Sequence, residues 1–559
     1  MSLLGQSVLA VGIAAATAVV CSAQGTGQMG SAGQEVLAKF AVFEVFVKAA
    51  VRGGNPFADA AAEAVFTSPS GGRVRLEGFH DGDGRWGFRF MPREHGAWRY
   101  EAKVLDRRAD AGSPQRVAGS AVGSFLCKGQ TGRGPLRISK RNRFRMEYED
   151  GTPFYPIGVQ TGGFTRVGFD GPRRTEGRWR TIPIAEWCRR FEGATTLVRW
   201  QMNPGGPAEH ALALIAADGG LDRYDLKIAA KMDRLYRLQK QHGFSHILIP
   251  FEDMSLWGRR TTPFGGIRDL EQYKSLKAAN LPRQEQYLRY LVARYACWVD
   301  VWEIFNEDSF APDDYLAHLA RVIREADPYD HPVTTNYARP DQAWCEIVTW
   351  HEYMGMPANR VDAYLAKEIG KFKAYGKPVI NTEFGNQGWR SNYDPVKWRI
   401  AVWTAFMNES SMLFWNSSGV KSEGRRPYRG NANAYLGAAS RKAFRVLNDF
   451  NRTMPIDMRP VASGYTEHND VRVYALSNRT VTAVYVHHFS DHEKAYQLPD
   501  PLFVQTGPGT FRLRWIDPAD GRLVRREQLA TAQQFLVIEK IPPVKIDLAC
   551  RMDRSNQRP

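Results

Sequence analysis

The sequence predicts an α/β protein, a (β/α)8 (TIM) barrel flanked by N-terminal and C-terminal antiparallel β-sandwich domains. A chain of 559 residues is too long for one hydrophobic core, since domains average about 150 residues. Apolar strand-like runs alternate with helix-like periodicity through residues 134–452. Residues 33–133 and 455–552 instead alternate apolar and polar residues, as antiparallel strands do. Hydrophobic content of 43% provides enough material for a large core.

The chain begins with a segment typical of a secretory signal peptide. Residues 8–20 are apolar, and small residues follow that suit cleavage after Ala23. We therefore expect removal of residues 1–23 and export to the periplasm or the cell exterior. The pattern departs from the usual one because no Lys or Arg precedes Lys39. Lipid anchoring through Cys21 is the less favoured alternative, and no later run is apolar and long enough to predict stable membrane insertion.

The two flanking segments are predicted as sandwiches from strands of period two separated by turns. In the first, an Asp-Gly-Asp-Gly run between two such strands is typical of a hairpin turn. The polar tail after the last strand of the second segment is expected to be disordered. The clearest alternating strands are residues 73–79, 85–90, 470–476, 481–486 and 511–515.

The barrel is predicted from eight apolar runs with helices between them. Helical spacing of apolar residues is clearest in 226–238, 287–292 and 316–323. In a (β/α)8 barrel the C-terminal tips of the strands carry the chemistry. The eight expected strands are 154–159, 195–200, 246–250, 299–307, 332–335, 346–350, 377–383 and 412–415.

Charge and cysteine content narrow the classes of partner. The formal net charge is +16, and residues 1–23 contribute none of it. A basic surface favours polyanionic partners, and for an exported protein an acidic polysaccharide fits better than nucleic acid, for which no motif is present. An Arg-rich proteome explains the charge equally well. The cysteines lack CxxC spacing and no HExxH motif occurs, so we expect neither metal nor cofactor.

Two glutamates end two of the expected barrel strands. Glu307 closes the fourth strand and Glu383 the seventh. Hydrolysis of a sugar acetal requires one protonated carboxyl group, to release the leaving oxygen, and one ionised carboxylate, to attack or stabilise the anomeric carbon. A single strand-end Glu is usually only a solvated residue, but the pair favours an enzyme.

Strand parity adds a buried ion pair to this prediction. Glu303 shares a face with Glu307 and lies deeper in the fourth strand, so it needs a buried partner. Arg199, at the end of the second strand, is the candidate for that partner or for a residue that holds a catalytic carboxylate.

Other strand ends carry polar and aromatic side chains suited to a sugar. A Tyr hydroxyl can orient a nucleophilic carboxylate, and a Trp can form the floor beneath a sugar ring. Each such residue also has a purely structural alternative: rim packing for Tyr353, a place in the barrel core for Trp415 and a solvated loop position for Glu252. The candidates for substrate binding are Asn306, Arg199, His351, Tyr353, Trp415 and Glu252.

In combination, the Asn-Glu at strand four, the His-x-Tyr near strand six and the Thr-Glu-Phe-Gly at strand seven resemble clan A of the retaining glycoside hydrolases. The resemblance implies that Glu307 is the general acid/base and Glu383 the nucleophile of a double displacement. It also implies that Asn306 binds the sugar 2-hydroxyl and that Tyr353 supports Glu383.

The order of domains is similar to that of apiosidase-like hydrolases of pectin side chains. It also resembles related bacterial proteins with an uncharacterised N-terminal domain and a so-called collagen-binding C-terminal domain. The segments that carry this similarity are 134–158 and the Trp-Ile-Asp-Pro-Ala-Asp-Gly run at 515–521. The expected partner is an oligosaccharide or polysaccharide. The sugar, its linkage and anomeric configuration, endo or exo action and the oligomeric state stay open.

Two other classes of protein compete with a glycosidase. A non-catalytic carbohydrate-binding or cell-surface scaffold protein could retain a barrel-shaped cleft, but the presence of both glutamates beside Asn306 argues against an inactive site. A collagen-active metalloprotease lacks support because no HExxH motif occurs.

Overall fold

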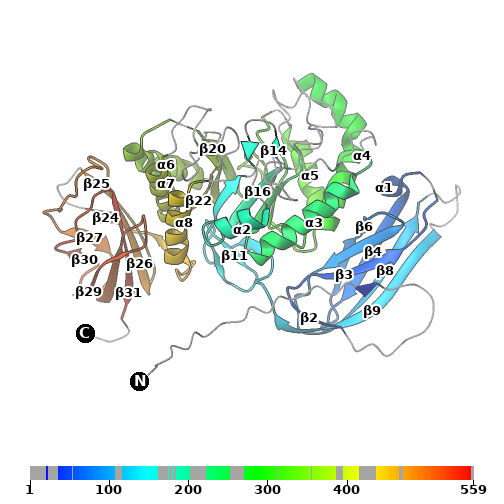
Figure 1. The fold of residues 1–559 in the computed structure, drawn as a ribbon, viewed down its shortest axis with the longest axis horizontal. Helices are drawn as coiled ribbons and strands as arrows, with labels where there is room; N and C mark the ends of the chain where they lie inside the picture. The colour runs from blue at the N-terminus through cyan, green and yellow to red at the C-terminus, as the bar shows by residue number, and fades with distance from the viewer. Residues whose placement is uncertain are drawn as a thin grey trace. The chain divides into compact units, whose positions relative to one another are not determined.

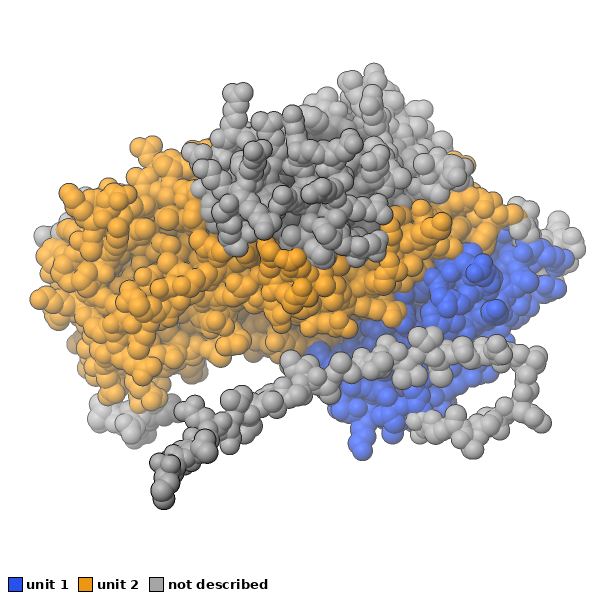
Figure 2. All heavy atoms as spheres, viewed as in Figure 1, with its two compact units in different colours: residues 1–53, 59–132 blue, residues 54–58, 133–559 orange. Residues whose placement is uncertain are grey.

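The computed structural model describes most of the chain. Its residues fall into two compact units, 1–53 with 59–132 and 54–58 with 133–559, coloured separately in Figure 2. Most of the predicted signal peptide lies outside the described residues. The described ranges are 21–22, 35–52, 54–107, 116–160, 174–175, 179–180, 184–201, 214, 222–251, 270–309, 311–353, 355–385, 394–414, 436–464 and 470–555.

The first unit is a pair of β-sheets around one apolar core. Its strands are β1 (Cys21–Ser22), β2 (Val36–Lys39), β3 (Phe43–Lys48), β4 (Ala60–Thr67), β5 (Arg73–Glu77), β6 (Phe79–His80), β7 (Arg85–Phe90), β8 (Gly96–Asp106) and β9 (Arg116–Gln130). The sheets have the orders β1-β3-β7-β6 and β2-β9-β8-β4-β5. Side chains along β4 alternate between more and less buried positions, as expected of a strand with one face on the core. The core includes Phe43, Phe66, Phe88 and Trp98.

The centre of the second unit is a parallel sheet of eight strands (Figure 1). These strands are β13 (Ile157–Gln160), β16 (Leu197–Gln201), β17 (Ser245–Ile249), β18 (Val301–Glu303), β19 (Val333–Thr334), β20 (Val348–Glu352), β21 (Val379–Phe384) and β22 (Ser410–Phe414). The order β19-β18-β17-β16-β13-β22-β21-β20 follows the chain around a barrel. The barrel closes between β19 and β20, where the Glu346 N–H donates to the Val333 carbonyl at 2.9 Å. The predicted (β/α)8 barrel is confirmed.

Helices connect the barrel strands, and side-chain caps define where two of them begin. Asp225 accepts backbone hydrogen bonds at the start of α3, and Asp394 does so at the start of α7. The helices in the described part of the chain are α1 (Pro56–Asp59), α2 (Ile184–Phe191), α3 (Leu226–Gln241), α4 (Leu270–Tyr295), α5 (Asp313–Ala326), α6 (Ala358–Lys373), α7 (Pro395–Met407) and α8 (Ala438–Asn451). None of the helices searched is long and apolar enough to cross a membrane.

A small antiparallel sheet contributes to the apolar core at one end of the barrel. Its strands are β10 (Leu136–Ile138), β11 (Met146–Tyr148) and β12 (Pro153–Phe154). Side chains from this sheet form one buried cluster with residues from the first half of the barrel strands, among them Leu197, Ile247 and Val301. This cluster closes the N-terminal end of the barrel with mostly apolar side chains, while the C-terminal ends of the strands carry Arg199, Glu303 and Glu383. Strands β14 (Arg174–Thr175) and β15 (Trp179–Arg180) form a separate two-stranded sheet.

Two further sheets form the C-terminal sandwich around its own core. The strands are β23 (Arg459–Pro460), β24 (Ser463–Gly464), β25 (Val471–Ser477), β26 (Val481–His488), β27 (Leu502–Gln505), β28 (Gly509–Ile516), β29 (Leu523–Thr531), β30 (Phe535–Ile538) and β31 (Asp547–Arg554). They pair as β23-β25-β26-β31-β28-β29 and β24-β27-β30, which confirms antiparallel strands at 470–476, 481–486 and 511–515.

Helix α7 joins the barrel to this sandwich through buried polar and aromatic contacts. The Arg399 guanidinium donates to both carboxylate oxygens of Asp547, at 2.9 and 2.8 Å. Beside this ion pair, the rings of Trp403 and Tyr485 stack with centroids 5.4 Å apart. The barrel and the C-terminal sandwich are therefore packed as one unit.

Candidate active site

Arg199 is the buried centre of the polar cluster in the barrel. It lies in β16, and its side chain has no exposed surface. Its Nε donates to Glu303 at 2.8 Å, and its Nη2 donates to the other oxygen of Glu303. The pairing expected from strand parity is thus present, and both side chains are 0% exposed. Two buried opposite charges in this fork geometry satisfy each other, where either alone would be costly.

Glu383 is held by donors on both of its carboxylate oxygens. Arg199 Nη1 donates to Oε1 at 2.6 Å, and the Tyr353 hydroxyl donates to Oε2. A register shift between Trp350 and His351 places His351, not Tyr353, opposite Glu383 in the β20–β21 pairing. Burial and the neighbouring Glu383 carboxylate raise the pKa of Tyr353, so this hydroxyl stays protonated and remains a donor.

Glu307 lies beyond the end of β18 in an uncommon backbone conformation. Its φ is +51°, in the left-handed region, which costs a residue with a side chain about 1 kcal/mol. The Asn336 side chain accepts from the Glu307 N–H at 3.3 Å, and the Asn336 carbonyl accepts from the next N–H, that of Asp308, at 2.7 Å. The Glu307 side chain is 28% exposed, so it is more open to solvent than Glu383. Backbone strain that neighbouring residues hold in place is common at functional sites.

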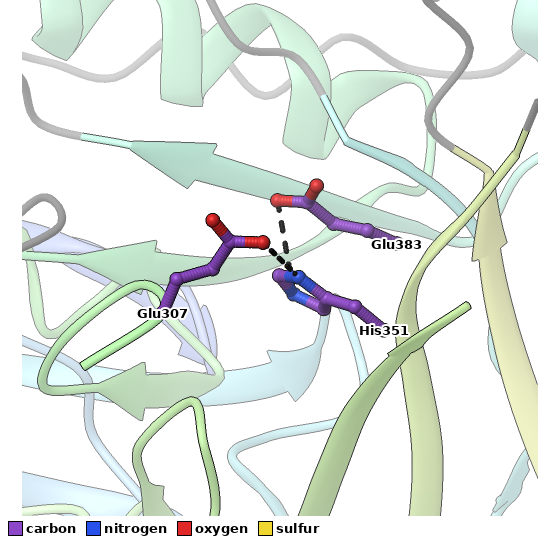
Figure 3. Close-up of side chains that lie close together, drawn as sticks. All are labelled: Glu307, His351 and Glu383. Carbon is purple, nitrogen blue, oxygen red and sulfur yellow. Dashed lines mark hydrogen bonds and ion pairs between the residues drawn. The ribbon is translucent and has the colours of Figure 1, made fainter. Parts of the chain in front are cut away.

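His351 connects the two glutamates (Figure 3). Its Nδ1 lies 2.8 Å from Glu307 Oε1, and its Nε2 lies 3.8 Å from Glu383 Oε1. The ring is 3% exposed, and its Nε2 has no hydrogen-bond partner within the described part of the chain. The pKa of Glu307 is lowered, chiefly by the hydrogen bond with His351; burial opposes this shift, and the charges of His351 and Arg199 add to it.

The other predicted site residues have different outcomes. Asn306 is 6% exposed, and its Oδ1 accepts from Arg199 Nη2 at 2.7 Å, so the group that it can offer a sugar is its amide donor. Arg199 and His351, two of the candidates for substrate binding, are both buried and contact the glutamates: Arg199 pairs with Glu303 and Glu383, and His351 with Glu307. Glu252 and Trp415 lie outside the described residues.

Asn336 and Tyr337, which follow β19, were missed by the sequence reasoning. Asn336 is fully buried and supports the backbone at Glu307, while Tyr337 stands beside His351 with ring centroids 6.2 Å apart. The available signal was the position of an Asn-Tyr pair directly after the fifth expected strand, where a barrel carries its functional side chains.

Three ligand-type atoms come close together in this site. One atom each from Glu307, His351 and Glu383 lies within 4.8 Å of the others, and this is the group among the described residues that could approach a metal ion. However, both oxygens of Glu383 already accept from Arg199 and Tyr353, and the guanidinium would repel a cation. The arrangement suits a pair of carboxylates in proton transfer and nucleophilic attack better than it suits a metal.

Comparisons with known proteins extend the fold assignment. Residues 36–104 match a domain of unknown function, DUF5060. A Bacteroides vulgatus structure described as a candidate glycoside hydrolase has a TM-score of 0.64 and 16% identity, over 93% of this chain and 100% of that one. A glycoside hydrolase family 5 structure from the same organism has a TM-score of 0.53 and 15% identity, over 76% and 94%. No curated protein matches this chain.

These similarities establish the fold that the chain shares with glycoside hydrolase barrels. The first covers nearly the whole chain, including the regions on either side of the barrel.

Proposed function

We propose that this protein is a retaining glycoside hydrolase that cleaves a glycosidic bond in a complex polysaccharide by double displacement. The observation that carries the proposal is the buried arrangement in which Arg199 and Tyr353 hold Glu383 while His351 holds Glu307. One carboxylate is thus fixed by donors to both of its oxygens, and the other is more exposed and faces it.

The spacing of the two carboxyl groups supports retention of configuration. An oxygen of Glu307 lies within 4.8 Å of an oxygen of Glu383. Retaining glycosidases hold their carboxyl groups about 5–5.5 Å apart, whereas inverting enzymes leave about 6.5–9.5 Å for a water molecule. The closer pair favours direct attack by one carboxylate.

In the first step Glu383 attacks the anomeric carbon as the bond to the leaving oxygen breaks and Glu307 donates its proton to that oxygen. Arg199 and Tyr353 aim the attacking carboxylate through their hydrogen bonds. In the second step a water molecule attacks the anomeric carbon, Glu307 takes its proton, and the ester bond to Glu383 breaks. Asn306 offers its amide donor to the sugar 2-hydroxyl.

The substrate that we propose is an acidic or branched polysaccharide met outside the cytoplasm. The net charge of +16 favours an anionic polymer, and the apolar N-terminal segment favours export. The resemblance to apiosidase-like hydrolases points toward pectin side chains.

The test is to incubate the purified protein with a panel of pectic, sulfated and neutral polysaccharides and to analyse released sugars. Release of defined products, with retained configuration of the new hemiacetal by NMR, is the expected result. Binding to a polysaccharide without any new reducing ends would favour the non-catalytic carbohydrate-binding protein. A matched Glu307→Gln/Glu383→Gln variant controls for contaminating hydrolases.

The lowered pKa of Glu307 predicts an acidic pH optimum. Glu307 must be protonated in the first step, so kcat/KM falls as the pH rises through its pKa. His351→Leu removes the hydrogen bond that lowers this pKa, so the alkaline limb of kcat/KM should move to higher pH. A hydrogen bond to a charged group contributes about 1.5–3 kcal/mol, which corresponds to a shift of about one to two pH units.

The matched variant for this experiment is His351→Asn. An Asn side chain offers an amide donor near the place of His351 Nδ1, so the limb should stay close to that of the parent protein. The measurement is a pH profile of kcat/KM on the best substrate of the panel. A limb that moves equally in both variants, or in neither, would contradict the assignment of this pKa to the His351–Glu307 contact.

A further inference from the structure

Tyr337 is an aromatic side chain that stays exposed beside His351, the residue that contacts both glutamates. It is 46% exposed, and its ring lies 6.2 Å from that of His351, centroid to centroid. Scattered surface aromatics are common and need no explanation. The position of this one, directly after β19 at the C-terminal end of the barrel, is what sets it apart.

Hydrogen bonds fix the backbone that carries Tyr337. Its N–H donates to the Asp308 carbonyl at 3.4 Å, and its own carbonyl accepts from Arg339 Nη1 at 2.6 Å. The same guanidinium also donates to the Asp308 carbonyl, at 3.2 Å. The preceding residue, Asn336, is fully buried. The segment that carries Tyr337 is therefore fixed, so binding a substrate there need not order its backbone.

The position of Tyr337 relative to the glutamates indicates which part of a substrate it would meet. Its segment is bonded to the backbone of Glu307 and Asp308, while Glu383 lies on the other side of His351. In the proposed reaction Glu383 bonds to the sugar that is retained, and Glu307 protonates the oxygen of the group that departs. We therefore assign a side chain carried by this segment to the side of the leaving group.

We propose that Tyr337 is the stacking platform of a leaving-group subsite, against which the departing sugar lays the apolar face of its ring. The inference rests on the proposed function and adds a requirement to it, namely that the leaving group is itself a pyranose. A flat aromatic ring with a polar hydroxyl offers an apolar surface to the C–H face of a sugar and leaves the sugar hydroxyls in water. The preferred substrate is then an oligosaccharide or polysaccharide, and not a glycoside with a small leaving group.

The experiment compares two probes that differ only in the group that departs. For each sugar that the panel shows to be cleaved, the probes are its pentasaccharide and the fluoride of its tetrasaccharide, for example cellopentaose and β-cellotetraosyl fluoride for a β-glucan. The departing fluoride has no ring for Tyr337 to contact. The variants are Tyr337→Ala and Tyr337→Phe, with Tyr375→Ala as the control. Tyr375 is 44% exposed and precedes β21, at the opposite end of the barrel.

We expect Tyr337→Ala to lower kcat/KM for the pentasaccharide about tenfold and to leave that for the fluoride within twofold, while Tyr337→Phe and Tyr375→Ala behave like the parent protein. An equal loss on both probes in Tyr337→Ala would overturn the proposal, because Tyr337 would then support Glu307 or His351. Unchanged rates on both probes would overturn it as well. If the parent protein cleaves neither the panel nor the probes, the proposed function fails first and the subsite fails with it.

Discussion

Replacing Glu383 by Ala is expected to lower kcat on the cleaved substrate by about 10⁴-fold or more, a loss typical of a residue that acts within a catalytic unit. The variant should stay folded, because Arg199 keeps both of its hydrogen bonds to Glu303 when Glu383 is removed. The measurement is the single-turnover and steady-state rate on an aryl glycoside of the cleaved sugar, with thermal unfolding as the check on folding.

Azide identifies the role of the missing carboxylate. In Glu383→Ala a small anion can attack the anomeric carbon from the side where the nucleophile stood, and one displacement gives a glycosyl azide of inverted configuration. In Glu307→Ala the glycosyl-enzyme still forms with an activated aryl leaving group, and azide then replaces water, so two displacements give a retained azide. The two variants are thus matched controls for each other.

Three results would contradict these assignments. A Glu383→Ala protein that turns over at the parent rate would remove Glu383 from the chemistry. Rescue of that variant with retained configuration would exchange the roles of the two glutamates. Rescue of neither variant, with both folded, would argue against a covalent intermediate.

The sequence predicted the barrel because the apolar pattern of each segment matches the burial that a barrel requires of it. Each barrel strand is a short apolar run, which fits a strand buried on both faces, and helices with apolar spacing separate most of them. The alternation of side chains in a strand also predicted a buried partner for Glu303, and the structure provides one in Arg199. These predictions needed only the spacing of apolar residues along strands and helices and the need of a buried charge for a partner.

The details of the site were harder to predict because they depend on backbone geometry between strands. Strand β18 ends at Glu303, four residues before Glu307, which sits in a left-handed conformation supported by Asn336. Nothing in the sequence near Glu307 signals this turn, since neither glycine nor asparagine occupies the position. Likewise, the register shift that brings His351 opposite Glu383 is a property of strand pairing and has no local motif.

The second large effect is expected for Arg199→Met, which should destabilise the unit that contains the barrel by about 3–5 kcal/mol. Removing the guanidinium leaves the fully buried Glu303 carboxylate without its counter-charge, and an unpaired buried charge carries a penalty of that size. The measurement is the shift in the urea and thermal unfolding midpoints of the full chain. Lys371→Met is the matched control: Lys371 pairs with Glu368 at 2.7 Å but is 58% exposed, so its loss should cost under about 1 kcal/mol.

A double variant separates the two functions of Arg199. Arg199→Met/Glu303→Leu removes both buried charges, so it should recover most of the stability lost in the single variant. Activity should not return, because Glu383 would still lack the Nη1 donor at 2.6 Å and Asn306 the Nη2 donor at 2.7 Å. If the double variant is as unstable as Arg199→Met, the loss comes from packing and not from the buried charge of Glu303. If it recovers activity together with stability, Arg199 supports the barrel without aiming Glu383, and the hydrogen bonds that hold this carboxylate are not required for attack.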